Sequence, residues 1–364
     1  MFILALIVSP VMTSSAESYH RKFIAHRGVN LRSTIAGENS LEAIRLAARA
    51  GFDAIETDVR LTADDSLVVM HDATLNRTCL NADGSPITAD TKIADLKYDE
   101  LSSYKLKADS ARMQTAIPLL ADYLSECRDN GLFTFIEPKL VDPTGRYYRR
   151  IIVLADSVFG KNNYVITSNN KANIIIRDSL GIKDVPLMGI LYQTTFPEIE
   201  RLGNVIMAIS ASKIKDPAYS GYVDLSVSKG LKTESHADRF EHFAKIDRNR
   251  IDYISTDFLA PDFSEDMHVG ILLDTPVILN GDASLEKGAV LEFPTRMKVA
   301  FGAAYLDMEF DGKLKITLGN QTFVADGGNP LNYRVMLYES EPVLIVEALS
   351  RSVIRKLNFK TVDF

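Results

Sequence analysis

Residues 22–61 read KFIAHRGVNLRSTIAGENSLEAIRLAARAGFDAIETDVRL, and this stretch decides the predicted fold. The apolar runs at 23–26 and 54–59 predict two buried strands, and the apolar spacing over 39–50 predicts a helix between them. Asn39 is the predicted N-cap of that helix, because its side chain can accept a hydrogen bond from the first turn. A helix between two neighbouring strands is the crossover of a parallel sheet, so the stretch predicts an α/β fold.

The same alternation of strand-like and helical segments continues to about residue 261. The predicted strands lie at 23–26, 54–59, 67–71, 133–137, 164–167, 185–191, 205–210, 222–227 and 251–256. This pattern and length predict a closed (β/α)8 barrel of the TIM type at 22–262. Nine predicted strands exceed the eight of such a barrel, and the segment at 67–71 follows its predecessor too closely for a helical crossover. The topology around that segment therefore stays open.

Two segments differ from the barrel pattern. Residues 73–118 are polar and rich in turn residues, and an insertion of that length in a barrel is typical of a cap or lid. Beyond Pro261 the segments become short and alternating, which predicts an all-β, sandwich-like domain at 269–364. Three roles for this domain stay open: packing against the barrel, binding a carbohydrate, polymer or lipid headgroup, and forming a homo-oligomer interface.

The first residues form a separate apolar segment. Residues 2–12 are apolar, and the small residues Ser14-Ser15-Ala16 that follow have the spacing that a signal peptidase needs. We therefore expect a signal peptide at 1–16 and a periplasmic or secreted protein. No Lys or Arg precedes the apolar run, and a buried strand is the alternative. No other segment approaches the length of a membrane span, so no stable span is expected.

Charge and cysteine content narrow the function further. Of the 364 residues, 41 are Lys or Arg and 48 are Asp or Glu, which gives a formal net charge of −7. This balance argues against a nucleic-acid partner. An anionic substrate would need positive charge within its own binding site. The only two cysteines, Cys79 and Cys127, are too few for a disulfide scaffold, and we expect free thiols.

Histidines and charged residues follow several of the predicted strands. His26 and Arg27 end the first strand, and Glu56 and Asp58 lie two residues apart, and hence on one face, of the second. In a parallel barrel, the carboxyl ends of the strands form the active-site face. Two carboxylates at that face repel each other unless a cation lies between them, and a metal ion or a basic side chain could fill that role.

Two further strands end in the same kinds of residue. The strand at 67–71 ends in His71, and the strand at 133–137 ends in Glu137, with Lys139 two residues on. No single motif decides the function, since an isolated histidine is often a core residue. The set of motifs is more specific than any one of them.

Taken in order, these motifs resemble the glycerophosphodiester phosphodiesterase family, whose members are relatives of the phosphoinositide-specific phospholipases C. The resemblance covers about residues 22–261. The matching motifs are His26-Arg27-Gly28, Glu38-Asn39-Ser40, Glu56-Thr57-Asp58-Val59, His71-Asp72, Leu75-Asn76-Arg77-Thr78, Glu137-Pro138-Lys139 and Ser255-Thr256-Asp257. The resemblance implies a metal-dependent phosphodiesterase on a barrel fold, in which residues 73–118 are the family's insertion over the barrel mouth.

The resemblance also implies roles for individual residues. Glu56, Asp58 and Glu137 would hold the metal, and His26 and His71 would transfer protons, with His26 as the base and His71 as the acid. Carboxylate oxygens are hard ligands, so the expected cation is Ca²⁺ or Mg²⁺.

Further predicted site residues surround this group. We expect Arg27 and Lys139 to neutralise the substrate phosphate and Glu38 and Asn39 to support the site. Family members usually carry a Trp near the end of the seventh strand, whereas this chain has no Trp, and Leu225 or Ser226 lies near that position in the predicted alignment. The missing indole would alter the wall that faces the alcohol or the glycerol of the substrate.

Three functions remain at this stage. The first is hydrolysis of a small-molecule glycerophosphodiester to glycerol 3-phosphate and an alcohol. The second is a phospholipase-D-like lyase reaction, in which a neighbouring hydroxyl of the substrate attacks phosphorus and a cyclic phosphate is released. The third is a non-catalytic binding barrel, and the intact set of histidines, carboxylates and Lys139 speaks against it.

Overall fold

The computed structural model describes most of the chain from residue 22 onward. The described residues are 22–191, 194–247, 250–261, 272–273, 277–294, 301–319, 321–338 and 343–364. The predicted signal peptide at 1–16 lies outside them. So does most of the segment between the two predicted domains.

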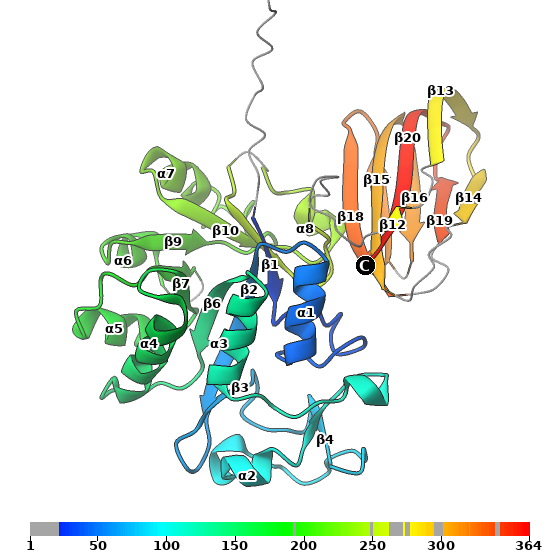
Figure 1. Ribbon diagram of the computed structural model, residues 1–364. Helices are drawn as coiled ribbons and strands as arrows, with labels where there is room; N and C mark the ends of the chain where they lie inside the picture. The colour runs from blue at the N-terminus through cyan, green and yellow to red at the C-terminus, as the bar shows by residue number, and fades with distance from the viewer. Residues whose placement is uncertain are drawn as a thin grey trace, which may run out of the picture.

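Eight parallel strands close into a barrel (Figure 1). In chain order they are β1 (Lys22–His26), β2 (Ala54–Leu61), β6 (Phe133–Pro138), β7 (Tyr164–Ser168), β8 (Leu187–Ile190), β9 (Val205–Ala208), β10 (Lys232–His236) and β11 (Tyr253–Thr256). Strand β1 pairs in parallel with both β2 and β11, and these pairings close the sheet. The predicted TIM-type barrel is confirmed.

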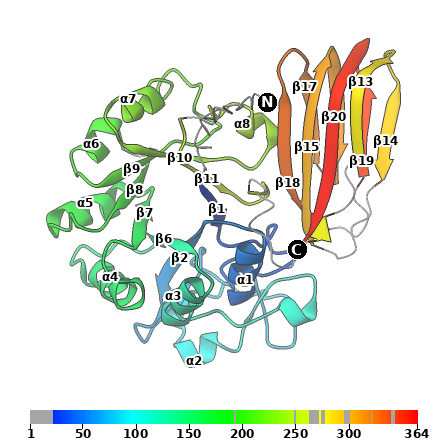
Figure 2. The same cartoon turned by 45° about the horizontal axis from the view of Figure 1, so that its top comes forward.

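Helices surround the barrel, as the view in Figure 2 shows. They are α1 (Leu41–Arg49), α3 (Leu120–Asp129), α4 (Arg146–Phe159), α5 (Lys171–Ser179), α6 (Phe196–Glu200), α7 (Tyr222–Ser228) and α8 (Phe240–Phe243). Among the described residues, no helix combines the length and the apolar character needed to cross a membrane. Helix α1 begins one residue later than predicted, because Ser40, and not Asn39, caps it by accepting a hydrogen bond from the backbone of Ala43.

Two of the predicted strands differ from the structure. The segment at 222–227 is helix α7, whose buried residues Val223 and Ser226 lie three apart as on one helix face. The seventh barrel strand is instead β10, which the sequence analysis missed. The segment at 67–71 forms β3 (Leu67–Val69), which runs antiparallel to β2 and lies outside the ring of eight. The position of β3 outside the ring resolves the excess in the predicted strand count, whereas β10 replaces the segment at 222–227 one for one.

The side-chain alternation of the strands places the site above the barrel interior. Ile24, Ala54 and Phe135 belong to an apolar cluster inside the barrel. Two residues further on, toward the carboxyl ends, the same strands carry His26, Glu56 and Glu137. Residues two apart on a strand face the same side, so these ionisable groups project over the barrel interior.

Residues 73–118 form a small unit with its own core. It contains β4 (Cys79–Leu80), β5 (Lys105–Leu106), α2 (Tyr98–Leu101) and two single 3₁₀ turns, at Ile93–Asp95 and Ala111–Met113. Its apolar side chains pack together with residues around β3. Cys79 lies in this core and Cys127 lies on α3, and both are buried free thiols, as expected.

The C-terminal domain consists of two antiparallel sheets. Its strands are β12 (Leu272–Leu273), β13 (Val277–Leu285), β14 (Val290–Pro294), β15 (Gly302–Asp311), β16 (Lys313–Leu318), β17 (Gln321–Asp326), β18 (Leu331–Leu337), β19 (Val343–Ala348) and β20 (Ser352–Asp363). One sheet has the order β12-β20-β15-β18, with β13 also paired to β20, and the other has the order β14-β19-β16-β17. The predicted all-β domain is confirmed.

The β domain contacts the barrel beside α8, and both Figure 1 and Figure 2 show α8 next to β18. The rings of Phe240 and Phe323 stack with their centroids 4.1 Å apart. The backbone N–H of Met336 donates to the carbonyl of Phe258 at 2.8 Å. Apolar stacking and a backbone hydrogen bond therefore join β17 and β18 to the barrel.

Candidate active site

Three buried carboxylates meet at the carboxyl ends of β2 and β6. Glu56 and Asp58 lie on β2, and Glu137 lies on β6, where it pairs in register with Asp58. One oxygen from each of the three lies within 4.8 Å of the others. The sequence placed these residues on two strands, and the pairing of the strands brings them together.

Two basic side chains contact these carboxylates. Lys139 Nζ lies 2.9 Å from Asp58 Oδ1 and 2.7 Å from Glu137 Oε2, and Arg27 Nε lies 3.2 Å from Asp58 Oδ2. Burial would raise the pKa of Asp58, but Lys139 and Arg27 outweigh it and hold that pKa at about 2. Asp58 is therefore ionised near neutral pH.

The surroundings of Glu56, in contrast to those of Asp58, disfavour the ionised carboxylate. Both of its carboxylate oxygens are buried without a hydrogen-bond partner among the described residues. Burial and the nearby charges of Asp58 and Glu137 raise its pKa well above the usual value. Burial also raises the pKa of Glu137. Three buried carboxylates that repel one another, one of them without a hydrogen bond among the described residues, are a donor set that a hard divalent cation fits, so these three residues fit a metal site.

His26 lies beside the carboxylates at the end of β1. Its Nδ1 lies 2.7 Å from Asp257 Oδ1, just beyond β11, and its Nε2 lies 3.7 Å from Glu56 Oε2. The pKa of Asp257 lies below its usual value, because His26 and neighbouring groups outweigh the effect of burial. An ionised carboxylate only accepts hydrogen bonds, so Nδ1 carries a proton and Nε2 faces the carboxylate cluster.

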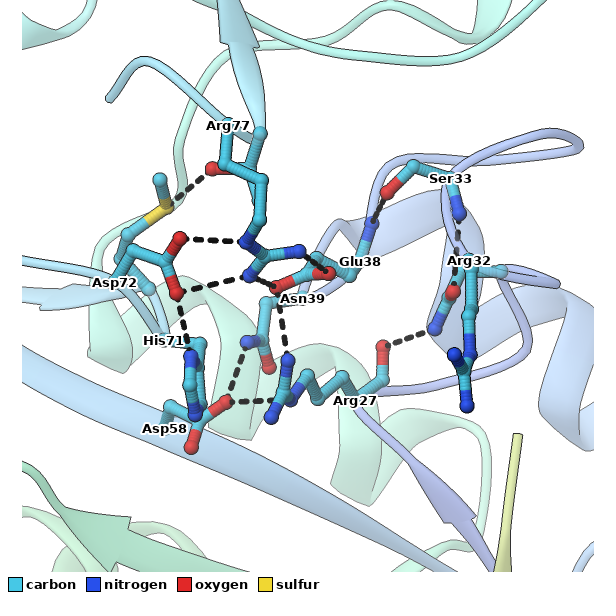
Figure 3. A network of polar contacts seen from close by, with 12 residues as sticks. Arg27, Arg32, Ser33, Glu38, Asn39, Asp58, His71, Asp72 and Arg77 are labelled. Carbon is cyan, nitrogen blue, oxygen red and sulfur yellow. Dashed lines mark hydrogen bonds and ion pairs between the residues drawn. The ribbon is translucent and has the colours of Figure 1, made fainter. Parts of the chain in front are cut away.

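His71, like His26, has its Nδ1 atom beside an aspartate carboxylate. Its Nδ1 lies 2.6 Å from Asp72 Oδ1, and Arg60 donates to its backbone carbonyl at 2.8 Å. Figure 3 shows the His71 ring between Asp72 and Asp58. Burial lowers the pKa of His71, with smaller and partly opposing effects from the surrounding charges.

A network of ion pairs surrounds this region (Figure 3). Glu38 accepts from Arg27 at 3.2 Å and from Arg77 at 2.8 and 2.9 Å, and Arg77 also binds Asp72. Arg77 comes from the 73–118 insertion, so the insertion helps to fix both Glu38 and the partner of His71. The predicted supporting role of Glu38 has a structural counterpart in these contacts.

Asn39 lies within hydrogen-bonding distance of the carboxylate strand. Its amide donates to Asp58 Oδ2 at 2.9 Å, and its carbonyl oxygen accepts from the Thr57 hydroxyl at 3.0 Å. The backbone of Asn39 has φ +63°, a left-handed conformation that Asn adopts more readily than most residues. Asn39 therefore orients Asp58. All nine site residues predicted from the sequence lie in this one region.

The sequence analysis missed a further group at the end of β10. The ring of His236 lies 5.0 Å from that of His26, its Nε2 lies 3.1 Å from Asp238 Oδ2, and its Nδ1 lies 3.0 Å from the hydroxyl of Ser255. Burial lowers the pKa of His236, but the Asp238 hydrogen bond and nearby carboxylates outweigh it and raise that pKa above the usual value.

The position of the expected Trp must therefore be corrected. Leu225 and Ser226, which the sequence alignment placed there, lie on helix α7, and His236 ends the seventh strand. The signal that could have revealed β10 is the pair of polar residues at its carboxyl end, His236 as its last residue and Asp238 just beyond it, which repeats the pattern of the other strand ends.

Comparisons with known proteins agree with this arrangement. Residues 26–208 match the family described as "Glycerophosphoryl diester phosphodiesterase family". Glycerophosphodiester phosphodiesterase 1 from Bos taurus is 36% identical over 117 residues, which are 32% of this chain and 33% of that protein, and the human protein of the same name is 35% identical over 117 residues. The chain thus spans about a third of the length of these relatives.

Solved structures match the barrel over a larger share of the chain. A glycerophosphodiester phosphodiesterase from Agrobacterium tumefaciens is 25% identical, with a TM-score of 0.53 over 65% of this chain and 96% of that one. A phosphodiesterase from Oleispira antarctica, solved in complex with sn-glycerol-3-phosphate, is 20% identical and shares the fold, with a TM-score of 0.54 over 66% of this chain and 94% of that one.

A closed (β/α)8 barrel with ionisable residues gathered at the carboxyl ends of its strands is the architecture of a barrel enzyme. The match over residues 26–208 makes the assignment more specific. The chain belongs to the glycerophosphoryl diester phosphodiesterase family.

Proposed function

We propose that the protein hydrolyses glycerophosphodiesters to glycerol 3-phosphate and an alcohol, with a divalent cation and two catalytic histidines. The observation that carries the proposal is the group of three buried carboxylates, in which neither oxygen of Glu56 has a hydrogen-bond partner among the described residues, between two histidines that are each held by an Asp. Membership of the family and the name of the bovine relative support glycerophosphodiesters as the substrate class.

Glu56, Asp58 and Glu137 are the residues that would hold the cation. All three offer oxygen ligands, which favours Ca²⁺ or Mg²⁺ over softer metals. A bound cation of this kind would supply a Lewis acid for the non-bridging oxygens of the phosphodiester. Arg27 and Lys139 add the positive charge that an anionic substrate needs beside three carboxylates.

The two histidines would transfer the protons. His26 presents Nε2 toward the carboxylate cluster, with Nδ1 fixed by Asp257, so it can accept a proton from the attacking water. His71, fixed by Asp72, would give a proton to the leaving alkoxide. Because burial lowers the pKa of His71, its protonated form is a stronger acid than free imidazolium.

Identification of the products tests this proposal. Purified protein is incubated with glycerophosphodiesters in the presence of Ca²⁺ or Mg²⁺, and the phosphorus products are identified by ³¹P NMR. We expect glycerol 3-phosphate. A cyclic phosphate as the final product would instead support the lyase reaction, and no product from any diester would support a non-catalytic barrel.

We further propose that residues 1–16 are a signal peptide and that the protein acts in the periplasm or outside the cell. The apolar run at 2–12 and the small residues before Glu17 support this proposal. Mass spectrometry of the protein expressed in its full form should find Glu17 as the first residue. Retention of residues 1–16 in the exported protein would contradict the cleavage.

A further inference from the structure

A polar cavity of about 430 Å³ lies between the barrel and the β domain. Its barrel side includes Arg32, Asp238, Glu241 and Phe258, and its β-domain side includes Gln321 and Thr322 of β17. We propose that this cavity is a subsite for a neutral, hydroxyl-rich group of the substrate, a sugar or a polyol. The inference rests on the proposed function and specifies which class of substrate group the β domain would help to bind.

The cavity adjoins the candidate active site. Arg32 and Asp238 line both this cavity and a smaller one bordered by His26 and Arg27. Arg32 contacts Asp238 at 3.2 Å and Asp257 at 3.4 Å, and Asp257 in turn holds His26. A substrate bound at the carboxylates therefore needs to extend only past this shared wall to reach β17.

The charges of the lining argue against a charged occupant. Arg32 and Arg239 face Asp238 and Glu241, so the cationic and anionic side chains are equal in number. Asp238 is already paired with Arg32 and with His236. Neither a second phosphate nor a cationic alcohol finds an excess of the opposite charge in this lining.

The aromatic rings also argue against a quaternary ammonium group. Such a cation binds over exposed faces of aromatic rings. Phe240 stacks on Phe323 at 4.1 Å, and the guanidinium of Arg32 lies over the Phe258 ring at 5.0 Å. One face of each of these three rings is therefore already covered, by another ring or by Arg32.

The polar groups of the lining suit hydroxyls, because each hydroxyl both donates and accepts a hydrogen bond. The Gln321 side-chain oxygen accepts from Tyr333, so its amide N–H groups remain as donors. The Thr322 hydroxyl, which lies 3.0 Å from the hydroxyl of Thr317, retains acceptor capacity, and the exposed Glu241 offers acceptor oxygens. The volume lies within the range of about 300–1,000 Å³ that small-molecule sites occupy.

The cavity borders the end of the seventh strand through Asp238. The seventh strand ends in His236, and the aromatic surface nearby comes from Phe240 of α8 and Phe323 of β17. The backbone hydrogen bond from Met336 to Phe258 fixes the two sides relative to each other. The β domain thus supplies part of a binding surface that the barrel alone lacks.

A cavity-filling substitution in the full chain tests the inference. Thr322 is exposed and lines the cavity, so Thr322→Trp adds an indole at the rim of the cavity without disturbing the core. Val324, which is 44% exposed, lies two residues further on the same strand face but lines a different cavity, so Val324→Trp is the matched control. The first readout is the kcat/KM ratio between the inositol ester and the methyl ester of glycerol 3-phosphate, with the choline ester as the cationic comparison.

The hydroxyl-rich group could belong to the alcohol or to a substituent on the glycerol, and a second measurement separates these sources. Binding of neutral glucosylglycerol and of free inositol is measured by saturation-transfer NMR, which needs no turnover. If the group belongs to the alcohol, the wild type prefers the inositol ester to the methyl and choline esters and binds free inositol. If it belongs to the glycerol, the wild type binds glucosylglycerol.

In either case we expect Thr322→Trp to lower the relevant preference or affinity about tenfold, as the loss of one or two hydrogen bonds would, and Val324→Trp to retain it. The inference is overturned if the wild type shows neither preference nor binding, or if both substitutions act alike. If no diester is hydrolysed, the proposed function fails, whereas the NMR measurement still decides whether the cavity binds a polyol.

Discussion

Glu56 is the site carboxylate whose negative charge is least compensated by hydrogen bonds or contacting basic side chains. Lys139 and Arg27 contact Asp58, whereas neither Glu56 oxygen has a hydrogen-bond partner among the described residues. Burial, together with the negative charges of Asp58 and Glu137, raises the pKa of Glu56, because protonation removes the charge that these surroundings disfavour. A bound divalent cation would relieve it as well and keep the carboxylate ionised.

Each of the three proposed metal ligands should be necessary for cation binding. Replacing Glu56, Asp58 or Glu137 by Ala removes one ligand and one negative charge, so divalent binding measured by calorimetry should weaken and hydrolysis should be lost. Ser125→Ala on helix α3, away from the carboxylates, serves as the control and should behave as wild type. Unchanged cation affinity in all three Ala variants would show that the cation binds elsewhere.

The two histidines should differ in their response to the leaving group. General acid or base catalysis contributes about 10²–10⁴-fold, so His26→Ala and His71→Ala should each lower kcat/KM by at least about 10²-fold. A nitrophenyl ester has an acidic leaving group that needs no protonation. It should partly rescue His71→Ala and not His26→Ala, and rescue of His26→Ala alone would reverse the two roles.

At the scale of single elements, the turn between β1 and α1 fixes the position of His26 and Arg27. Gly28 has φ +75°, and a Cβ added there would lie 2.6 Å from the Cβ of Ala43 in the first turn of α1. The residue must therefore be Gly both for its backbone conformation and for the close approach of the helix. The motif His26-Arg27-Gly28 is thus partly a packing requirement.

The substitution Gly28→Ala should destabilise the protein by both effects. Gly131→Ala is the matched control, because Gly131 has φ +70° but no described atom within 4 Å of the added Cβ. We expect Gly28→Ala to lower the free energy of unfolding in urea by about 1–3 kcal/mol more than Gly131→Ala does. Equal losses of unfolding free energy in the two variants would mean that α1 shifts away from the added methyl group of Gly28→Ala at no energetic cost.

The element that sequence reasoning missed, β10, shows where hydropathy patterns fail. Its sequence KTESH looks exposed, yet Thr233, Glu234 and Ser235 are buried. Thr233 donates to the Arg250 carbonyl and Ser235 to the Ile209 carbonyl, both at 2.8 Å or less. Such partners are distant in the sequence, so no local pattern reveals them, whereas the apolar strands that end in a charged residue were predictable.

The misassignment of Asn39 has a similar physical cause. A helix cap is a local feature and can be recognised from spacing, and Ser40 next to Asn39 satisfies it equally well. The contacts of Asn39 with Asp58 and Thr57 depend on the pairing of β1 and β2. The sequence thus indicated that the residue belongs to the site but not which atoms it contacts.

The raised pKa of His236 at the end of β10 predicts a pH-dependent contribution to stability. The folded state holds this proton more tightly than the unfolded state, so the contribution is complete below the unfolded pKa of about 6.5 and is lost as the pH rises through the folded pKa. The stability difference between wild type and His236→Gln should therefore shrink above about pH 6.5.

Chemical denaturation across this pH range measures that difference. His242→Gln is a useful control on the neighbouring helix α8, because burial lowers the pKa of His242 and its contribution changes in the opposite direction. A difference between wild type and His236→Gln that grows as the pH rises would contradict the assigned interaction with Asp238.

At the scale of the whole molecule, three parts of the chain meet around one site. The barrel strands carry the carboxylates and His26, the insertion at 73–118 supplies Arg77, and the β domain lines the adjoining cavity through β17. The sequence predicted each part separately. It could not predict their contacts, because the stacking of Phe240 on Phe323 joins residues far apart in the chain.

We propose that the three carboxylates hold a cation which hydrolysis requires. The most direct measurement is the rate of glycerol 3-phosphate release from a glycerophosphodiester by chelator-treated wild-type protein, before and after a titration with Ca²⁺ or Mg²⁺. We predict no turnover in the chelated protein and recovery that saturates with one of the two cations. Full activity in the chelated protein would contradict the account.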